Sequence, residues 1–162
     1  MDQFTIDRRF VLALRLLMGW VFLYAGLTQV TSGTFGTSEF LEHTRTFHPL
    51  YAPLTSPSIA PVLTFLVSYG HLLIGLSLVS GLFVRVSGPF GVLLMLTYWT
   101  AHMDFPYVES HVNFIIDYHI VYAVVIGYLV AADAGHAVGL DGWIARWRGT
   151  LPRMQSTQVH AG

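Results

Sequence analysis

The chain is 162 residues long, with 54% hydrophobic residues, 10% charged residues and a formal net charge of −1. A soluble domain normally carries about 25% charged residues, so this composition excludes an ordinary water-soluble surface. The length leaves room for a single domain, which we take as residues 1–162. The chain has no cysteine, which excludes disulfides, thiolate metal ligands and thiol redox chemistry by this chain itself.

Four long apolar stretches take up most of the chain and predict membrane-spanning helices. Each is close to the roughly 20 residues that cross a hydrocarbon core of about 30 Å, and none shows the period-two alternation of a strand. The stretches cover residues 11–30, 59–84, 86–103 and 113–132. Pro89 lies near the start of the third stretch, where the first turn of a helix tolerates proline. The sequence therefore predicts an all-α fold, an integral membrane four-helix bundle.

The arginines set the expected orientation, because all eight basic residues are arginine. Arg45 stands alone on one face of the predicted bundle. The other loop arginines fall on the opposite face: Arg8, Arg9, Arg85, Arg146, Arg148 and Arg153. The positive-inside rule then places both termini in the cytoplasm, in a multi-pass protein integral to the prokaryotic cytoplasmic membrane. We expect Arg15, in the first turn of the first span, to snorkel to the cytoplasmic surface.

Two segments are then external, residues 31–58 and residues 104–112. The longer one is too apolar for a free linker. Its residues 38–47 begin with Ser38, a residue type that caps helices, and they predict a short amphipathic helix that lies on the outer surface and folds back over the bundle. At the other end of the chain, we expect residues 152–162 to form a disordered tail.

Ionisable groups inside membrane spans are costly, so each one is a candidate for function. His71 lies near the predicted midplane of the second span, and Tyr98 shares a helix face with His102 on the third. Most of the remaining candidates fall in the outer third of the spans: Gln29, His102, His111, Asn113, Asp117 and His119. If the helices pack as a bundle, these side chains meet in one polar pocket in its outer half.

Structural roles compete with this interpretation. A histidine in a span often makes a hydrogen bond between helices rather than binding a ligand, and Asp117 is suited to capping the start of the fourth helix. No metal site is predicted, since the chain lacks paired histidines at helical spacing and a di-iron Glu-x-x-His pair. A bis-histidine haem would need His71 and His119, whose expected depths differ, so haem is the less favoured cofactor.

Four segments carry a family resemblance. They are an arginine-led first span at 15–26, Gly-Leu-x-x-x-x-Gly-Leu-Phe-x-Arg at 75–85, Asp-Tyr-His at 117–119, and Ala-Gly followed by Gly-Leu-Asp at 134–141. With these motifs, residues 10–142 resemble the DoxX/DoxD family. The resemblance implies a four-helix membrane protein. DoxD-type members are membrane subunits of a thiosulfate:quinone oxidoreductase, while DoxX-type members are linked to redox and oxidative-stress systems or serve as accessory subunits.

The sequence departs from the family at one place. Many DoxX members have a glutamate in the second span where this chain has Tyr69-Gly-His71, so His71 would have to replace that acid in handling protons. The absence of a cysteine that could carry a sulfane sulfur assigns any thiosulfate chemistry to a partner subunit.

The leading hypothesis is a DoxX/DoxD-like membrane redox subunit that binds quinone and handles protons in the outer half of the bundle. The catalytic assignments are Asp117, His119 and His71, and the assignments to quinone binding are Gln29, Tyr98, His102, His111 and Asn113. The alternative is a non-catalytic accessory subunit that stabilises a larger respiratory or oxidase complex, which leaves open whether the chain is an enzyme. The expected partners are the lipid bilayer, the quinone pool and other membrane or extracytoplasmic subunits, without nucleic acid.

Overall fold

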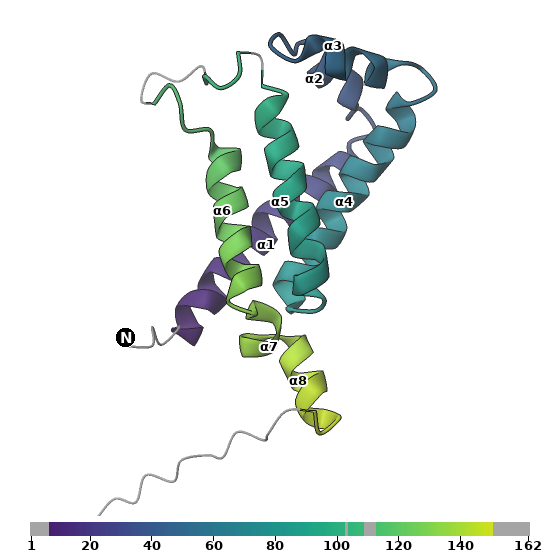
Figure 1. Ribbon diagram of the computed structural model, residues 1–162. Helices are drawn as coiled ribbons and strands as arrows, with labels where there is room; N and C mark the ends of the chain where they lie inside the picture. Colours follow the sequence, from purple (N-terminus) through teal and green to yellow (C-terminus); the bar gives the residue numbers. More distant parts are fainter. Residues whose placement is uncertain (1–6, 103, 109–112, 151–162) are drawn as a thin grey trace, which may run out of the picture.

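The computed structural model describes residues 7–102, 104–108 and 113–150, and these residues are mainly helical. Within them there is no strand, only an isolated bridge between Asp104 and Tyr107. The long helices form a bundle (Figure 1): α1 (Arg8–Thr31), α4 (Ala60–Ser80), α5 (Val84–Thr100) and α6 (Tyr118–Ala131). Short helices lie at its two ends: α2 (Thr37–Glu42), α3 (His48–Tyr51) and the 3-10 helix η1 (Ala52–Thr55) at one, α7 (Ala134–Val138) and α8 (Leu140–Trp147) at the other. We call the end that carries α2, α3 and η1 the capped end.

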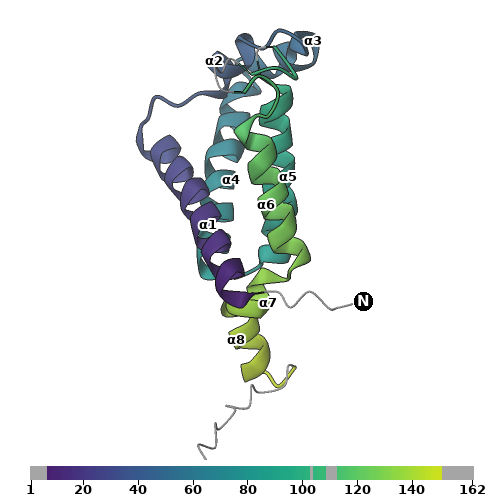
Figure 2. The ribbon, with the colours of Figure 1, turned by 90° about the vertical axis from the view of Figure 1, so that its left-hand side faces the viewer.

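Helices α1 and α4 cross at close range because glycines let their backbones approach. A Cβ added at Gly26 would overlap the backbone of Leu72, and one added at Gly75 would overlap the backbone of Leu23. Figure 2 shows α1 running obliquely, so that it lies near α7 at one end and away from α6 at the capped end. The apolar core fills the middle of the bundle: Val11, Met18, Phe22, Ile74, Leu78, Met95, Ile126 and Leu129.

Capping side chains and a glycine set the ends of these helices. The Asp7 carboxylate accepts the backbone N–H of Arg9 at 2.8 Å at the start of α1, and Asp117 caps α6 through the N–H of His119. Helix α4 ends at Ser80 and is capped by Gly81, whose φ of 70° is a left-handed conformation that glycine adopts without a steric penalty. The boundaries of the spans therefore depend on local hydrogen bonds and backbone sterics as much as on hydropathy.

The predicted boundary between the second and third spans is wrong. The span predicted at 59–84 stops at Ser80, because the chain turns at Gly81, and the span predicted at 86–103 is α5, which begins and ends earlier. Pro89 consequently lies inside α5 rather than in its first turn. The first span is confirmed as a helix and is slightly longer than predicted.

The predicted start of the fourth span is also wrong. Residues 113–117 precede α6 instead of opening it. The Asn113 side chain explains this difference, since its Oδ1 accepts the backbone N–H groups of Ile115 and Ile116 at 3.0 and 2.9 Å. Such Asx turns offer the backbone an alternative to helical hydrogen bonds. The apolar residues just before α6 therefore have the hydropathy of a membrane span, although they are not helical.

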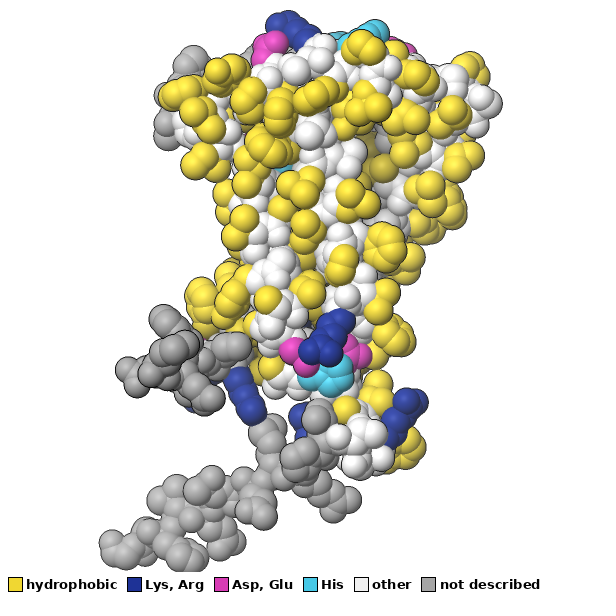
Figure 3. Space-filling view, in the orientation of Figure 1, with side chains coloured by type: hydrophobic (Ala, Val, Ile, Leu, Met, Phe, Trp, Pro, Cys, Tyr) yellow, Lys and Arg dark blue, Asp and Glu magenta, His cyan; other side chains and the backbone are white. Residues whose placement is uncertain are grey.

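Apolar side chains cover the outward faces of the long helices, while charged side chains gather at the two ends (Figure 3). The exposed apolar residues include Leu17, Trp20, Leu66, Leu73, Phe90, Leu93 and Val124. The buried polar residues include Arg15, Ser68, His71, Asp117 and His119. In the described part of the chain, α1 and α4 are long and apolar enough to cross a membrane, and α6 is apolar but shorter. Polar groups inside and apolar groups outside fit a protein whose surroundings are lipid.

The loop at the capped end folds back over the bundle, as predicted, but it forms two short helices and a 3-10 turn rather than one helix. Helix α2 begins at Thr37, after Gly36, and not with Ser38 as its cap. The Thr37 backbone N–H donates to the Thr64 hydroxyl of α4 at 3.1 Å, and the Thr44 hydroxyl donates to the carbonyl of Ala101 at 3.1 Å. These bonds hold the loop against α4 and the end of α5.

The opposite end contains a junction that the sequence did not predict. Arg15 is buried, with 3% of its surface exposed, so the expectation that it snorkels to the surface is wrong. Its Nη1 donates to the carbonyl of Ala134 at 3.3 Å, beside Gly81. Asp141 donates its backbone N–H to Gly81 and accepts the N–H of Phe83. Three of the motifs that carry the family resemblance thus meet in one structural contact.

Candidate functional site

A cavity of about 360 Å³ lies at the capped end of the bundle. All four long helices contribute to it, and the segment from Phe35 to η1 covers it. Its apolar lining includes Val21, Phe22, Phe35, Phe40, Leu41, Leu63, Val67 and Met95. Its polar lining consists of Gln29, Thr37, Tyr51, His71, Thr97, Tyr98, Tyr118, His119 and Tyr122. A mostly apolar space with a few convergent polar groups is the usual form of a small-molecule site.

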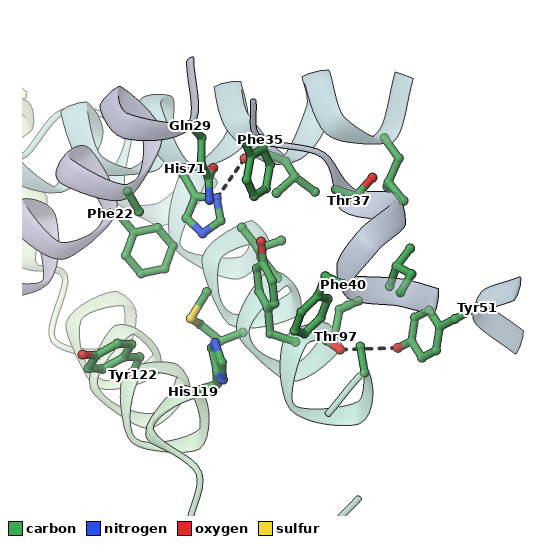
Figure 4. Close-up of a pocket in the computed structure, with 18 of the residues that line it drawn as sticks. Phe22, Gln29, Phe35, Thr37, Phe40, Tyr51, His71, Thr97, His119 and Tyr122 are labelled. Carbon is green, nitrogen blue, oxygen red and sulfur yellow. Dashed lines mark hydrogen bonds between the residues drawn. The ribbon is translucent and has the colours of Figure 1, made fainter. Parts of the chain in front are cut away.

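His71 enters the cavity from α4 and is buried. Its Nδ1 lies 2.9 Å from the carbonyl oxygen of Val67, which can only accept, so this nitrogen carries the proton. In the neutral ring, Nε2 is then a hydrogen-bond acceptor. Figure 4 shows that nitrogen directed away from the carbonyl, into the space beside Phe22. The ring centroids of His71 and Phe22 are 5.4 Å apart, and those of His71 and Tyr98 are 5.7 Å apart.

His119 enters from the first turn of α6 and is held by the carboxylate that caps this helix. The Asp117 Oδ1 accepts the backbone N–H of His119 at 2.7 Å and lies 2.5 Å from its Nδ1. The other carboxylate oxygen, Oδ2, lies 3.6 Å from Nε2 of His102. A carboxylate on Nδ1 fixes the orientation of an imidazole and leaves Nε2 as the nitrogen for other chemistry. Asp117 therefore connects two histidines, of which one lines the cavity.

Tyr98 and Gln29 complete the polar part of the cavity. The Tyr98 ring is stacked on the His119 imidazole, with centroids 5.1 Å apart and planes 7° from parallel. The Oε1 of Gln29 is buried and has no hydrogen-bond partner in the described part of the chain. The Gln29 amide also interacts with the Tyr98 hydroxyl, so these two side chains form one polar patch on the cavity wall.

The predicted site residues are only partly brought together. Four of them line the cavity: Gln29, His71, Tyr98 and His119. Asp117 and His102 do not line the cavity. Asp117 contacts His119 directly, and His102 lies next to Asp117. The assignment of Asn113 to quinone binding is not supported, because Asn113 is exposed and its side chain bonds the turn before α6. His111, also assigned to quinone binding, lies outside the described residues.

The sequence did not single out several lining residues. Phe22 lies two helical turns before Gln29, so the repeat of 3.6 residues could have placed both on one face of α1. Tyr51 gives no such signal, because it reaches the cavity only through the way the covering loop folds; its hydroxyl lies 2.7 Å from that of Thr100. In the described residues, no group of three or more His, Asp, Glu or Cys side chains is placed to hold a metal ion.

A comparison with protein families finds that the DoxX family model matches residues 10–103, which is more than half of the chain. The chain belongs to the DoxX family. DoxX proteins are typically membrane proteins. The match runs from α1 to α5, so it includes His71 and Tyr98 and leaves Asp117 and His119 outside. Neither a search of curated proteins nor a search of solved structures finds a match to this DoxX chain.

Proposed function

We propose that this DoxX protein is a membrane redox subunit that binds a quinone headgroup in the cavity at the capped end. The observation that carries the proposal is that two buried histidines, one on α4 and one on α6, reach the same mostly apolar space. A quinone is an apolar ring with oxygens at opposite sides, so it needs an apolar slot with polar groups that approach from different walls. His71 and His119 supply such groups, and Gln29 adds an unpartnered acceptor that suits a quinol hydroxyl.

For the membrane arrangement, we propose that all four long helices cross the bilayer with both termini in the cytoplasm. The capped end carries Arg45, which pairs with Asp104 at 3.1 Å, while the arginines at the opposite end include Arg8, Arg9, Arg85, Arg146 and Arg148. The positive-inside rule assigns that arginine-rich end to the cytoplasm. The cavity then lies in the outer half of the bilayer, at a depth that a quinone reaches from the hydrocarbon core.

His119 is the group we assign to proton handling. Quinol oxidation releases protons and electrons, and quinone reduction takes them up. The Nε2 of His119 accepts or returns a proton at a headgroup oxygen, while Asp117 stabilises the imidazolium that forms. The electrons pass to or from a partner subunit, because this chain has no cysteine that could hold a sulfane sulfur or an iron–sulfur cluster.

An accessory role in a larger complex has its own supporting observation. Helix α6 has 14 residues, which span about 21 Å and fall short of a hydrocarbon core of about 30 Å. A short span is often accommodated by association with other proteins. Apolar side chains are exposed on and just before this helix: Phe114, Ile116, Val121 and Val124. A partner packed against α6 would cover them.

A titration with decylubiquinone tests the proposed site. The full chain, purified in mild detergent, is titrated by calorimetry alongside His119→Ala and His71→Ala. A lost hydrogen bond in a buried site is worth about 1–3 kcal/mol, so we expect each variant to bind about 5- to 160-fold more weakly. His43→Ala is the matched control, because His43 is exposed at the same end and its ring bonds the carbonyl of Glu39 within its own helical turn. Equal binding by all four proteins, or no saturable binding, would refute the site.

A further inference from the structure

His102 occupies a different place from the one its sequence position suggests. It does not line the cavity, although it follows α5 and shares the capped end with the cavity residues. Its Nε2 lies 3.6 Å from Oδ2 of Asp117, and its Nδ1 is buried without a hydrogen-bond partner in the described residues. In the described residues, no hydrogen bond therefore holds the His102 ring through its second nitrogen.

Of these three side chains, Asp117 is the most buried and His102 is the most exposed. The His119 side chain, which lines the cavity, is 10% exposed, and the Asp117 side chain is 1% exposed. The His102 side chain is 27% exposed, so it reaches the surface at the capped end. The cavity is thus linked to the surface through one buried carboxylate that has an imidazole on each side.

Aromatic rings limit the other approaches to His119. The Tyr98 ring is stacked on the imidazole, and the centroid of the Tyr118 ring is 4.0 Å from it. The carboxylate of Asp117 is the polar group that contacts the Nδ1 side of the ring. A proton that arrives at His119 from the cavity has its shortest polar continuation through Asp117.

We propose that Asp117 and His102 form a proton route between the cavity and the water at the capped end, with His102 as a relay group and not a quinone ligand. The identity of the molecule that exchanges the proton in the cavity rests on the proposed function, but the route itself rests on the three side chains. In this route, His102 has a role that its position in the predicted third span did not indicate.

Each step of the route moves one proton, and the His119 ring then turns to restore its starting tautomer. A headgroup hydroxyl gives a proton to Nε2 of His119, whose Nδ1 proton passes to Oδ1 of Asp117. The Asp117 carboxyl group then turns so that this proton faces His102, and Nε2 of His102 accepts it. At 3.6 Å this last gap is too long for a hydrogen bond, and a rotation of the His102 ring or one bridging water closes it. The same rotation of the His102 ring brings the proton to the water at the capped end. The same steps in reverse order carry a proton from the water to the cavity.

Proton exchange at His119 tests this route without a quinone. The full chain, with ¹⁵N-labelled histidine in detergent micelles, is studied by NMR, and the exchange of the His119 Nδ1 proton with water is measured by saturation transfer. The His119→Gln variant assigns the signal. In His102→Gln we expect exchange to slow by about tenfold or more, within the range that a positioned proton-transfer group contributes. The matched control, His43→Gln, should exchange like the wild type.

A loss of structure would act in the opposite direction, because a loosened His119 exchanges faster. Unchanged or faster exchange in His102→Gln would therefore overturn the route. His102→Phe keeps an aromatic ring at this position and gives the same reading if the glutamine variant fails to fold. The decylubiquinone titration is independent, so a protein that binds no quinone but shows slowed exchange would refute the proposed function and keep the route.

Discussion

At the first turn of α6, the Asp117 carboxylate accepts the backbone N–H of His119 and also contacts the imidazole of the same residue. The two interpretations of Asp117 from sequence, a helix cap and a member of the site, are therefore compatible. A short side chain at an N-cap position can bond the backbone two residues on, and here the side chain of that residue points to the same oxygen. The cap is what orients His119 toward the cavity.

Substitution of Asp117 should separate these two roles. Asparagine is as good a cap as aspartate, whereas alanine removes the cap, at a typical cost of about 0.5–2 kcal/mol. We expect Asp117→Ala to lower the free energy of unfolding in detergent by about 1 kcal/mol more than Asp117→Asn does. Both should weaken decylubiquinone binding, because neither holds a charged carboxylate against His119. Unfolding curves in detergent and the titration measure the two effects, and equal stability of the variants would argue against the cap.

At the scale of the helix, the contact between α1 and α4 depends on where glycine faces a neighbouring backbone. Gly75 and Gly70 lie on the same helix, yet a Cβ at Gly75 would overlap Leu23, whereas a Cβ at Gly70 would meet nothing within 4 Å. The family motif at 75–85 begins with this glycine, so at least part of that motif serves packing.

The two glycines make a matched pair of variants. Gly75→Ala should destabilise the protein by about 1–3 kcal/mol, because α1 and α4 would have to separate. Gly70→Ala should leave stability unchanged or raise it by up to about 1 kcal/mol, since alanine is the better helix former. Thermal unfolding in detergent compares them, and a Gly75→Ala protein as stable as Gly70→Ala would mean that the close crossing is absent.

The sequence predicted the long helices better than their ends. Hydropathy located the cores of α1, α4, α5 and α6, because an apolar surface over several turns is a strong signal. It placed the start of α6 five residues too early, since Phe114, Ile115 and Ile116 are apolar but follow the Asx turn of Asn113. The short helices α7 and α8 were not predicted, because they are brief and each contains a helix-weakening glycine, Gly135 in α7 and Gly142 in α8.

At the scale of the whole molecule, depth along the spans accounts for the predicted residues that line one cavity, while their roles in the site stay predictions. His71 and His119 meet because both lie in the half of the bundle near the capped end, which counting residues along the spans could estimate. The role of His102 depends on which way its ring faces at the end of α5, and that direction is set by packing. The cover made by Phe35 and Tyr51 could not be predicted, because it depends on how a loop folds onto distant helices.

The membrane arrangement is testable because the chain has no native cysteine. In intact cells, a membrane-impermeant maleimide should label Tyr107→Cys at the capped end. It should label Thr150→Cys, after α8, only when the membrane is opened. Both positions are exposed, so accessibility to the reagent depends on the side of the membrane and not on burial. Labelling of Thr150→Cys alone in intact cells would reverse the orientation, and labelling of both would contradict a crossing by α6, which lies between them.

The central claim is that a quinone headgroup lies inside the bundle rather than on its lipid-facing surface, and photolabelling tests it most directly. The purified protein is irradiated with an azido-ubiquinone and the labelled peptides are identified by mass spectrometry. The account predicts label on residues of the cavity wall, such as Phe22, Tyr98 and Tyr122, and its loss when decylubiquinone is in excess. Label confined to outward residues such as Leu17, Leu66 and Phe90, and unaffected by the competitor, would contradict the account.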